Sequence, residues 1–109
     1  MADEKALVLI QEEHIDAFNR YADANGGIVD LSNAHLRAYD LRKCKLRKAN
    51  LSGAYMRASD LRSVDLSEAN LDGASIKEAK VSGVSFPRNL SPQELMMSLA
   101  HGTRLRTGL

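Results

Sequence analysis

Apolar residues recur at every fifth position through the middle of the chain, from residue 29 to residue 88. This block divides into twelve consecutive groups of five residues, and the central residue of every group is apolar. Those centres are Leu31, Leu36, Leu41, Leu46, Leu51, Met56, Leu61, Leu66, Leu71, Ile76, Val81 and Phe86. A mostly small residue lies two positions before each centre, and the other three positions are mostly polar. The pattern therefore predicts two inward-facing positions in every five residues.

A period of five excludes a regular helix or strand as the element that carries this pattern. In an α-helix each step of five residues advances by about 140°, which would scatter the leucines around the helix. In a strand an odd step would place successive leucines on opposite faces. The apolar positions share one interior only if the chain turns a corner in every group. Four corners close one coil of about 20 residues, so the block predicts about three stacked coils.

The pattern resembles the A(D/N)LxX repeat of the pentapeptide-repeat proteins, and the resemblance covers residues 29–88. It implies an all-β solenoid core, a right-handed quadrilateral β-helix of about three coils that is capped by short α-helices at both ends. The twelve centres would then form the structural core, as four ladders of residues 20 positions apart. Leu51 and Leu61 belong to the middle coil, and we expect them to tolerate substitution least.

Helix signals flank the repeat block on both sides. Between residues 6 and 25 the apolar positions are spaced by three to five residues, and a Gly-Gly pair follows, which indicates one or two short helices. Segment 18–21 is similar to the aromatic-Asn-x-aromatic leader that precedes the repeats in this family. We expect its aromatic residues to lie over the first coil.

The C-terminal segment carries several signals for a single helix of about ten residues. Ser91 fits the N-cap, Pro92 the first helical position and Glu94 the capping-box partner, and Gly102 would end the helix. We expect this helix to cover the last coil. The tail from Thr103 onward is predicted to be loosely ordered.

Length and charge then restrict the organisation and the partners. A chain of 109 residues predicts one single domain, divided into an N-terminal helical cap (1–28), the repeat block (29–88) and a C-terminal helical cap with tail (89–109). The net charge of +1 argues against a nucleic acid or an anionic membrane as the partner. The lone Cys44 suits a reducing compartment, and the N-terminus shows no secretory or membrane segment, so we predict a cytoplasmic protein.

The sequence contains no residue pattern typical of a catalytic site, and we predict that the protein is not an enzyme. His14, His35 and His101 are spaced unlike metal ligands, both among themselves and relative to Cys44. Cys44 occupies a small inward position, where a thiol behaves as a buried apolar group. We therefore expect no catalytic residue, no cofactor and no metal.

Two outward columns of charge distinguish neighbouring sides of the predicted coils. Arg42 and Arg62 follow Asp40 and Asp60 by two residues, so we expect these four side chains to neutralise one another. On the preceding side of the coils, the position before each apolar centre and the position after it contain basic and aromatic residues and no acid. This candidate partner-binding face consists of His35, Arg37, Tyr55, Arg57 and Lys77. Overall, residues 37–62 contain eight bases and two acids.

The leading hypothesis is a non-enzymatic interaction or scaffolding module that binds a protein partner, acidic if the basic face is used, through a rigid flat face. The family resemblance suggests an alternative, a DNA mimic that protects type II topoisomerases. The basic first half and the short length disfavour it, since a duplex mimic needs acidic charge. Direct nucleic-acid binding by the basic face ranks last. Formation of a homo-oligomer through the C-terminal helix stays open.

Overall fold

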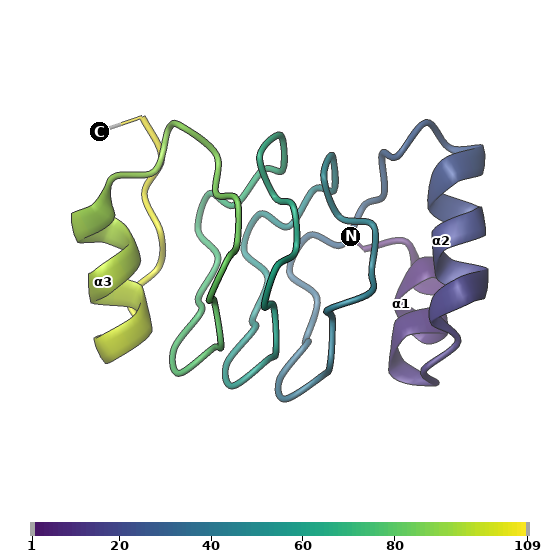
Figure 1. Ribbon diagram of the computed structural model, residues 1–109, viewed down its shortest axis with the longest axis horizontal. Helices are drawn as coiled ribbons and strands as arrows, with labels where there is room; N and C mark the ends of the chain where they lie inside the picture. The colour runs from purple at the N-terminus through teal and green to yellow at the C-terminus, as the bar shows by residue number, and fades with distance from the viewer. Residues whose placement is uncertain (1, 109) are drawn as a thin grey trace.

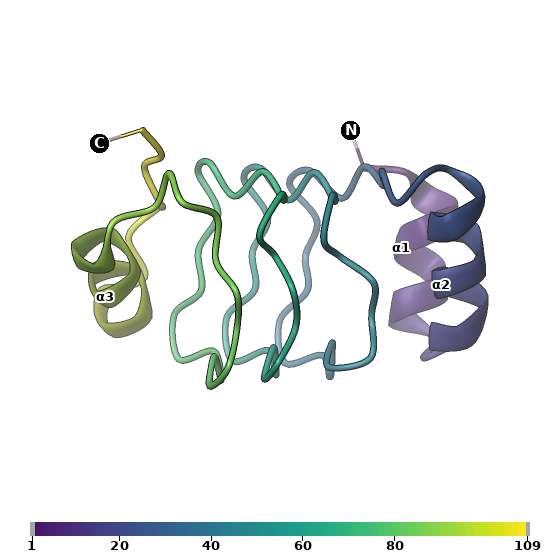
Figure 2. The ribbon, with the colours of Figure 1, turned by 45° about the horizontal axis from the view of Figure 1, so that its top comes forward.

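The computed structural model describes residues 2–108 of the chain. It contains three α-helices: α1 (Glu4–Gln11), α2 (Ile15–Ala24) and α3 (Pro92–His101). The repeat block lies between them as coils stacked side by side (Figure 1). Helices α1 and α2 lie against one end of this stack and α3 lies at the other end, as the rotated view in Figure 2 also shows. The long axis of the molecule runs along the stack.

The expected all-β core, a quadrilateral β-helix, is wrong as a description of the secondary structure. Within residues 2–108 there is no β-strand, and the coils meet only at isolated parallel bridges. The bridges join residues 20 positions apart, such as Asp30 to Asn50, His35 to Tyr55 and Asp40 to Asp60. A turn follows each bridge position from Asp30 to Lys80 within two residues. Each side of a coil is therefore too short for the consecutive pairs that make a strand.

Hydrogen bonds between coils and within turns explain the repeat pattern. Beside a bridge, Leu31 N–H donates to the Asn50 carbonyl and Asn50 N–H donates to the Val29 carbonyl, both at 2.8 Å. Six of the twelve centres follow an Asp or Asn that closes the next turn, because its side-chain oxygen accepts from the N–H two residues on. Asn50 Oδ1, for example, lies 3.0 Å from Ser52 N. The polar position before the centre is thus a turn-closing position.

The interior of the stack is formed by the predicted centres, with two exceptions. Ten of the twelve, from Leu31 to Ile76, are at most 1% exposed. Val81 and Phe86 are only partly buried, although they pack against the core. Both belong to the last coil, where no further coil covers them. The small inward residues Ala49, Ala54 and Ser59 are also buried, which lets the coil backbones approach closely.

The N-terminal helices close the first coil with one aromatic and one amide side chain. Asp3 caps α1, and its backbone N–H donates to the Asp30 carbonyl of the first coil at 2.7 Å. Phe18 of α2 is fully buried in the core, as expected for the leader segment. Asn19 binds the edge of the coil, because its amide donates to the Lys43 carbonyl and accepts from Lys45 N–H, both at 2.8 Å. These bonds replace those that a preceding coil would make.

Helix α3 begins and ends where the sequence predicts. Ser91 Oγ accepts from Glu94 N–H at 3.2 Å, Pro92 is the first helical residue, and Gly102 ends the helix at a φ of 73°. The capping-box role of Glu94 is wrong, however. Its carboxylate accepts from the Arg106 backbone N–H at 2.9 Å and from the Arg106 guanidinium at 2.8 Å. Glu94 therefore joins α3 to the tail.

The tail is ordered, contrary to the prediction of a loose terminus. Leu105 is 1% exposed, and it forms backbone hydrogen bonds with two residues of the last coil. Leu105 N–H donates to the Ala74 carbonyl at 2.8 Å, and Gly73 N–H donates to the Leu105 carbonyl at 2.7 Å. The tail thus covers part of the open edge of the stack in the manner of a further coil.

Candidate functional site

The side of the stack that carries Asp40 and Asp60 is electrically neutralised, as the sequence predicts. Each carboxylate binds the guanidinium two residues on with both oxygens, at 3.0 and 2.8 Å for Asp40 with Arg42 and at 2.9 and 2.7 Å for Asp60 with Arg62. Arg42 also reaches Asp60 in the next coil at 3.4 Å. Arg42 and Arg62 hold the pKa of each carboxyl at about 2, mainly through these hydrogen bonds. This side therefore has no unpaired charge among these four residues.

On the candidate partner-binding face, His35, Arg37 and Tyr55 lie next to one another and are exposed. His35 and Tyr55 occupy neighbouring coils at a parallel bridge, and their ring centroids are 6.3 Å apart. Tyr55 is 42% exposed, which is unusual for a large aromatic side chain in this protein. Arg37 is exposed and forms no ion pair with any residue of the described chain. These three residues form a compact cationic and aromatic surface.

The other two predicted members of this face are partly engaged. Arg57 lies 3.6 Å from the carboxylate of Glu78. Glu78 is two positions after an apolar centre, so it belongs to neither of the two outward columns from which the face was predicted. The stem of Lys77 packs beside Gly102, since a Cβ added there would lie 3.1 Å from Lys77 Cδ. The expectation of an uncompensated cationic face is therefore too broad. Of its three bases only Arg57 is ion-paired; Arg37 and Lys77 form no ion pair within residues 2–108, and Arg37 lies with His35 and Tyr55 on the most exposed part of the face.

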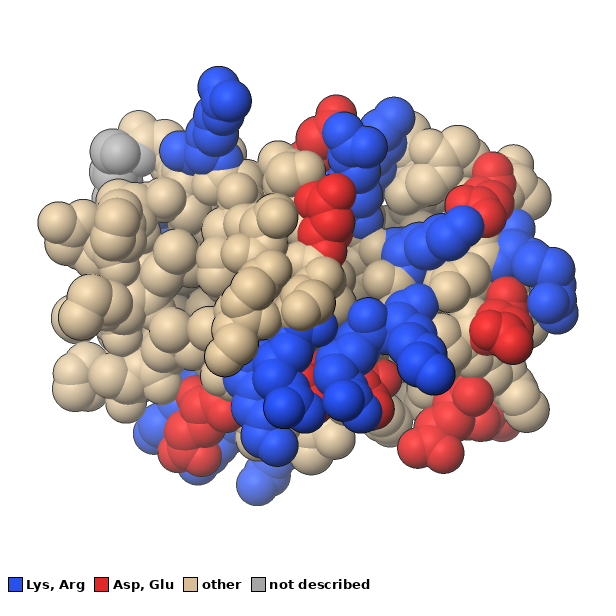
Figure 3. All heavy atoms as spheres, in the orientation of Figure 1, with Lys and Arg blue, Asp and Glu red and all other residues tan. Residues whose placement is uncertain are grey.

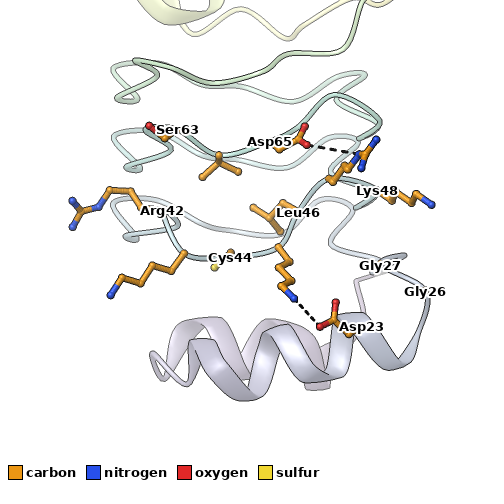
Figure 4. A pocket seen from close by; sticks show the side chains of 13 residues that line it. Asp23, Gly26, Gly27, Arg42, Cys44, Leu46, Lys48, Ser63 and Asp65 are labelled. Atoms are coloured by element: carbon orange, nitrogen blue, oxygen red, sulfur yellow. Dashed lines mark hydrogen bonds and ion pairs between the residues drawn. The ribbon is translucent and has the colours of Figure 1, made fainter.

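A pocket of about 460 Å³ opens on another side of the molecule, between α2, the first coil and the second coil. It is lined by Asp23, Gly26, Gly27, Arg42, Lys43, Cys44, Lys45, Leu46, Arg47, Lys48, Ser63, Val64 and Asp65. Figure 4 shows Asp23 of α2 below the first coil, with Cys44 and Leu46 in that coil and Ser63 and Asp65 in the next. Sequence reasoning missed this pocket. The excess of bases in residues 37–62 was its only signal in the sequence.

Ion pairs neutralise some of the bases around this pocket. Lys45 lies 2.8 Å from Asp23, and Arg47 lies 2.6 Å from Glu68 and 3.7 Å from Asp65. Lys43 and Lys48 form no ion pair within residues 2–108. The pocket therefore keeps two uncompensated ammonium groups on its lining.

Cys44 and the histidines provide little reactive chemistry. Cys44 is 6% exposed, and burial raises the pKa of its thiol to about 12, so the nucleophilic thiolate is not populated near neutral pH. Among residues 2–108, no group of three or more His, Cys, Asp or Glu side chains could hold a metal ion. His14 lies 3.7 Å from Glu12, far along the chain from His35 and His101.

Charge is distributed unevenly over the surface. Lys and Arg side chains gather over the coils in Figure 3, whereas the α3 end is mostly uncharged in that view. On α3, Met96 is 69% exposed and Met97 is 47% exposed. Self-association through this helix stays a prediction. In the described part of the chain, no helix is long and apolar enough to cross a membrane.

Comparison with known proteins agrees with the repeat seen in the sequence. No curated protein and no solved structure matched the chain. The family of pentapeptide repeats matched it with eight copies, over residues 29–62 and 49–86. Together these matches run from residue 29 to residue 86, more than half of the 109 residues, and they include the coils that line both the candidate face and the pocket. The chain therefore belongs to the pentapeptide-repeat family.

Proposed function

We propose that this protein is a non-enzymatic interaction module that binds an acidic segment of a partner protein on the surface formed by His35, Arg37 and Tyr55. The coils are joined by backbone hydrogen bonds, which makes this side a stiff platform that loses little conformational entropy on binding. Arginine and tyrosine are enriched where protein interfaces gain most of their binding energy. Family membership is consistent with a role in interactions.

The observation that carries the proposal is the exposure of Tyr55 beside an arginine without an ion-pair partner. An exposed aromatic ring gains free energy when a partner covers it, and a nearby guanidinium selects carboxylates through paired hydrogen bonds. A hollow of about 450 Å³ lies next to His35, between α1 and the first coil. Leu7 and Ala34 supply apolar lining there, so one side chain of the partner has room to insert.

Capture of partners from native lysate tests this proposal with the double variant Arg37→Glu/Tyr55→Ala. Neither side chain takes part in a hydrogen bond or ion pair in the described structure, so the fold should survive the exchange. We expect the variant to lose partners that the wild type retains. The control is Lys80→Glu, a charge reversal of another exposed base on a different side of the coils.

A partner held equally by the wild type and by Arg37→Glu/Tyr55→Ala would contradict the proposal. Loss of the same partner from Lys80→Glu would contradict it as well, because bulk charge and not this surface would then control binding. Circular dichroism and thermal unfolding of each variant verify that the fold is intact.

A further inference from the structure

One side of the first coil departs from the hydrogen-bonding pattern of the other sides. Beside His35, Leu36 N–H donates to the Tyr55 carbonyl and Tyr55 N–H donates to the Ala34 carbonyl, both at 2.8 Å. Ten residues later the equivalent donors are Leu46 N–H and Asp65 N–H. Neither donates to any group of residues 2–108, and no bridge joins residues 45 and 65. Asp65 nevertheless bridges normally to Ser85 in the third coil.

The turn at Lys43 explains this local separation of the two coils. Ser63 and Gly83, which occupy the same position in the following coils, have positive φ values of 64° and 73°. Lys43 does not adopt a positive φ, so its turn cannot match the turns stacked on it. On its other edge the same segment is bound to α2, through the two hydrogen bonds of Asn19 with Lys43 and Lys45.

The result is a pocket with an unusual set of donors. Leu46 lines the pocket and is 1% exposed, so its N–H is a buried donor without an acceptor among residues 2–108. Asp65 N–H is the corresponding donor of the second coil. Lys43 and Lys48 add two ammonium groups without ion-pair partners, and Lys48 extends at the edge of the pocket in Figure 4. Two backbone donors and two ammonium groups on the lining of one pocket favour a ligand with several oxygens and negative charge.

We propose that this pocket binds a small phosphate-bearing molecule. A phosphate group carries nearly two negative charges and three acceptor oxygens, so it suits a pocket that offers backbone N–H donors beside ammonium groups. A carboxylate has two oxygens and a single charge, so it would leave part of this donor set unused. The pocket volume of about 460 Å³ lies in the range of small-ligand sites. Leu46, Val64 and Cys44 line it with apolar surface for the rest of the ligand.

This site is independent of the proposed partner-binding surface. His35 and residue 45 are ten positions apart, which is half of a 20-residue coil, so the two lie on opposite sides of the stack. Binding in the pocket therefore requires no protein partner and leaves the His35, Arg37 and Tyr55 surface accessible.

Titration of the full ¹⁵N-labelled chain with pyrophosphate, adenosine monophosphate and succinate tests the proposal by NMR. We expect the amide signals of Leu46 and Asp65 to shift saturably with a phosphate probe, because a new acceptor occupies both N–H groups. Succinate carries two carboxylates and controls for general attraction of anions. Unmoved signals with both phosphate probes would overturn the proposal. Equal shifts and affinity with succinate would overturn the phosphate assignment.

The double variant Lys43→Ala/Lys48→Ala separates this pocket from the charge of the whole chain. We expect its Kd for the phosphate probe to rise by about tenfold or more, since each lysine contributes a charge-assisted hydrogen bond. The matched control, Lys80→Ala/Arg88→Ala, removes two exposed bases that do not line the pocket. An unchanged Kd in the first variant, or an equal rise in both, would overturn the site.

Discussion

Asp40 and Asp60 each make two kinds of interaction, a hydrogen bond that closes a turn and an ion pair on the surface of the coil. In each, Oδ1 accepts from the backbone N–H two residues on, at 3.1 Å from Arg42 N and 3.2 Å from Arg62 N. The same carboxylates bind the two guanidinium groups. Because Asn can close the same turn but carries no charge, exchange of Asp for Asn separates the two contributions.

We predict that Asp40→Asn/Asp60→Asn lowers stability at neutral pH and that its deficit disappears in acid. Their arginine partners depress the pKa of both carboxyls from 3.8 to about 2. A depressed pKa means that the stabilisation is present above the unfolded-state value and is lost as the pH falls from about 4 to about 2. Urea unfolding of both proteins between pH 7 and pH 2 measures this. Glu13→Gln is the control, because Glu13 is an exposed carboxyl between α1 and α2 that forms no ion pair within residues 2–108. A deficit that persists unchanged at pH 2 would argue against the ion pairs as its source.

At the scale of elements, the two ends of the stack are closed by different means. At the N-terminal end the Asn19 side chain of α2 satisfies edge groups of the first coil. At the C-terminal end the tail pairs its backbone with residues 73 and 74, and Ser98 Oγ of α3 accepts from Ile76 N–H at 3.1 Å. Open edges of this kind invite pairing with other chains, so both caps protect the stack from aggregation.

The tail contributes to stability through Leu105, and we predict that Leu105→Ala costs about 2–5 kcal/mol in free energy of unfolding. The side chain is 1% exposed, so truncation leaves a cavity next to the last coil. Met96→Ala on α3 is the control, because Met96 is 69% exposed and its truncation should change stability by less than about 0.5 kcal/mol. Chemical denaturation compares the two. Equal, small effects would mean that the tail does not pack on the stack in solution.

At the scale of the whole molecule, stability should be greatest in the middle of the stack. A middle coil contacts neighbours on both sides, whereas the last coil is covered only where α3 and the tail reach it. Leu51 is fully buried, and Phe86 is only partly buried despite its size. Repeat proteins of this kind derive their stability from contacts between neighbouring units.

We predict that Leu51→Ala destabilises the protein more than Phe86→Ala does, by about 2–5 kcal/mol for Leu51. By residue type alone the opposite order would be expected, because phenylalanine buries more surface than leucine when both are fully enclosed. Thermal unfolding of the two variants decides between burial and residue type. If Phe86→Ala is the more destabilising, the end of the stack is packed as tightly as its middle.

The spacing of Leu31 through Ile76 was sufficient to predict a shared interior and contacts between residues 20 apart, because a period of five leaves the chain no other way to bury them. Local signals at Ser91, Pro92 and Gly102 likewise predicted the bounds of α3, since capping depends on neighbouring residues. The strands expected from the family resemblance are absent from residues 2–108, because turns leave each side too short for a ladder. The period alone does not contain that information.

Tertiary structure alone decided which outward charged residues have no ion-pair partner and where neighbouring coils lack hydrogen bonds to each other. The pairing of Arg57 with Glu78, the docking of Leu105 and the tie between Asn19 and Lys43 join residues that no local pattern relates. The pocket exists because one turn, at Lys43, differs from the turns at Ser63 and Gly83 stacked on it. The sequence determined the inside of this protein through its period. Contacts between distant residues determined its surface, because side chains there pair according to the packing of neighbouring coils and caps.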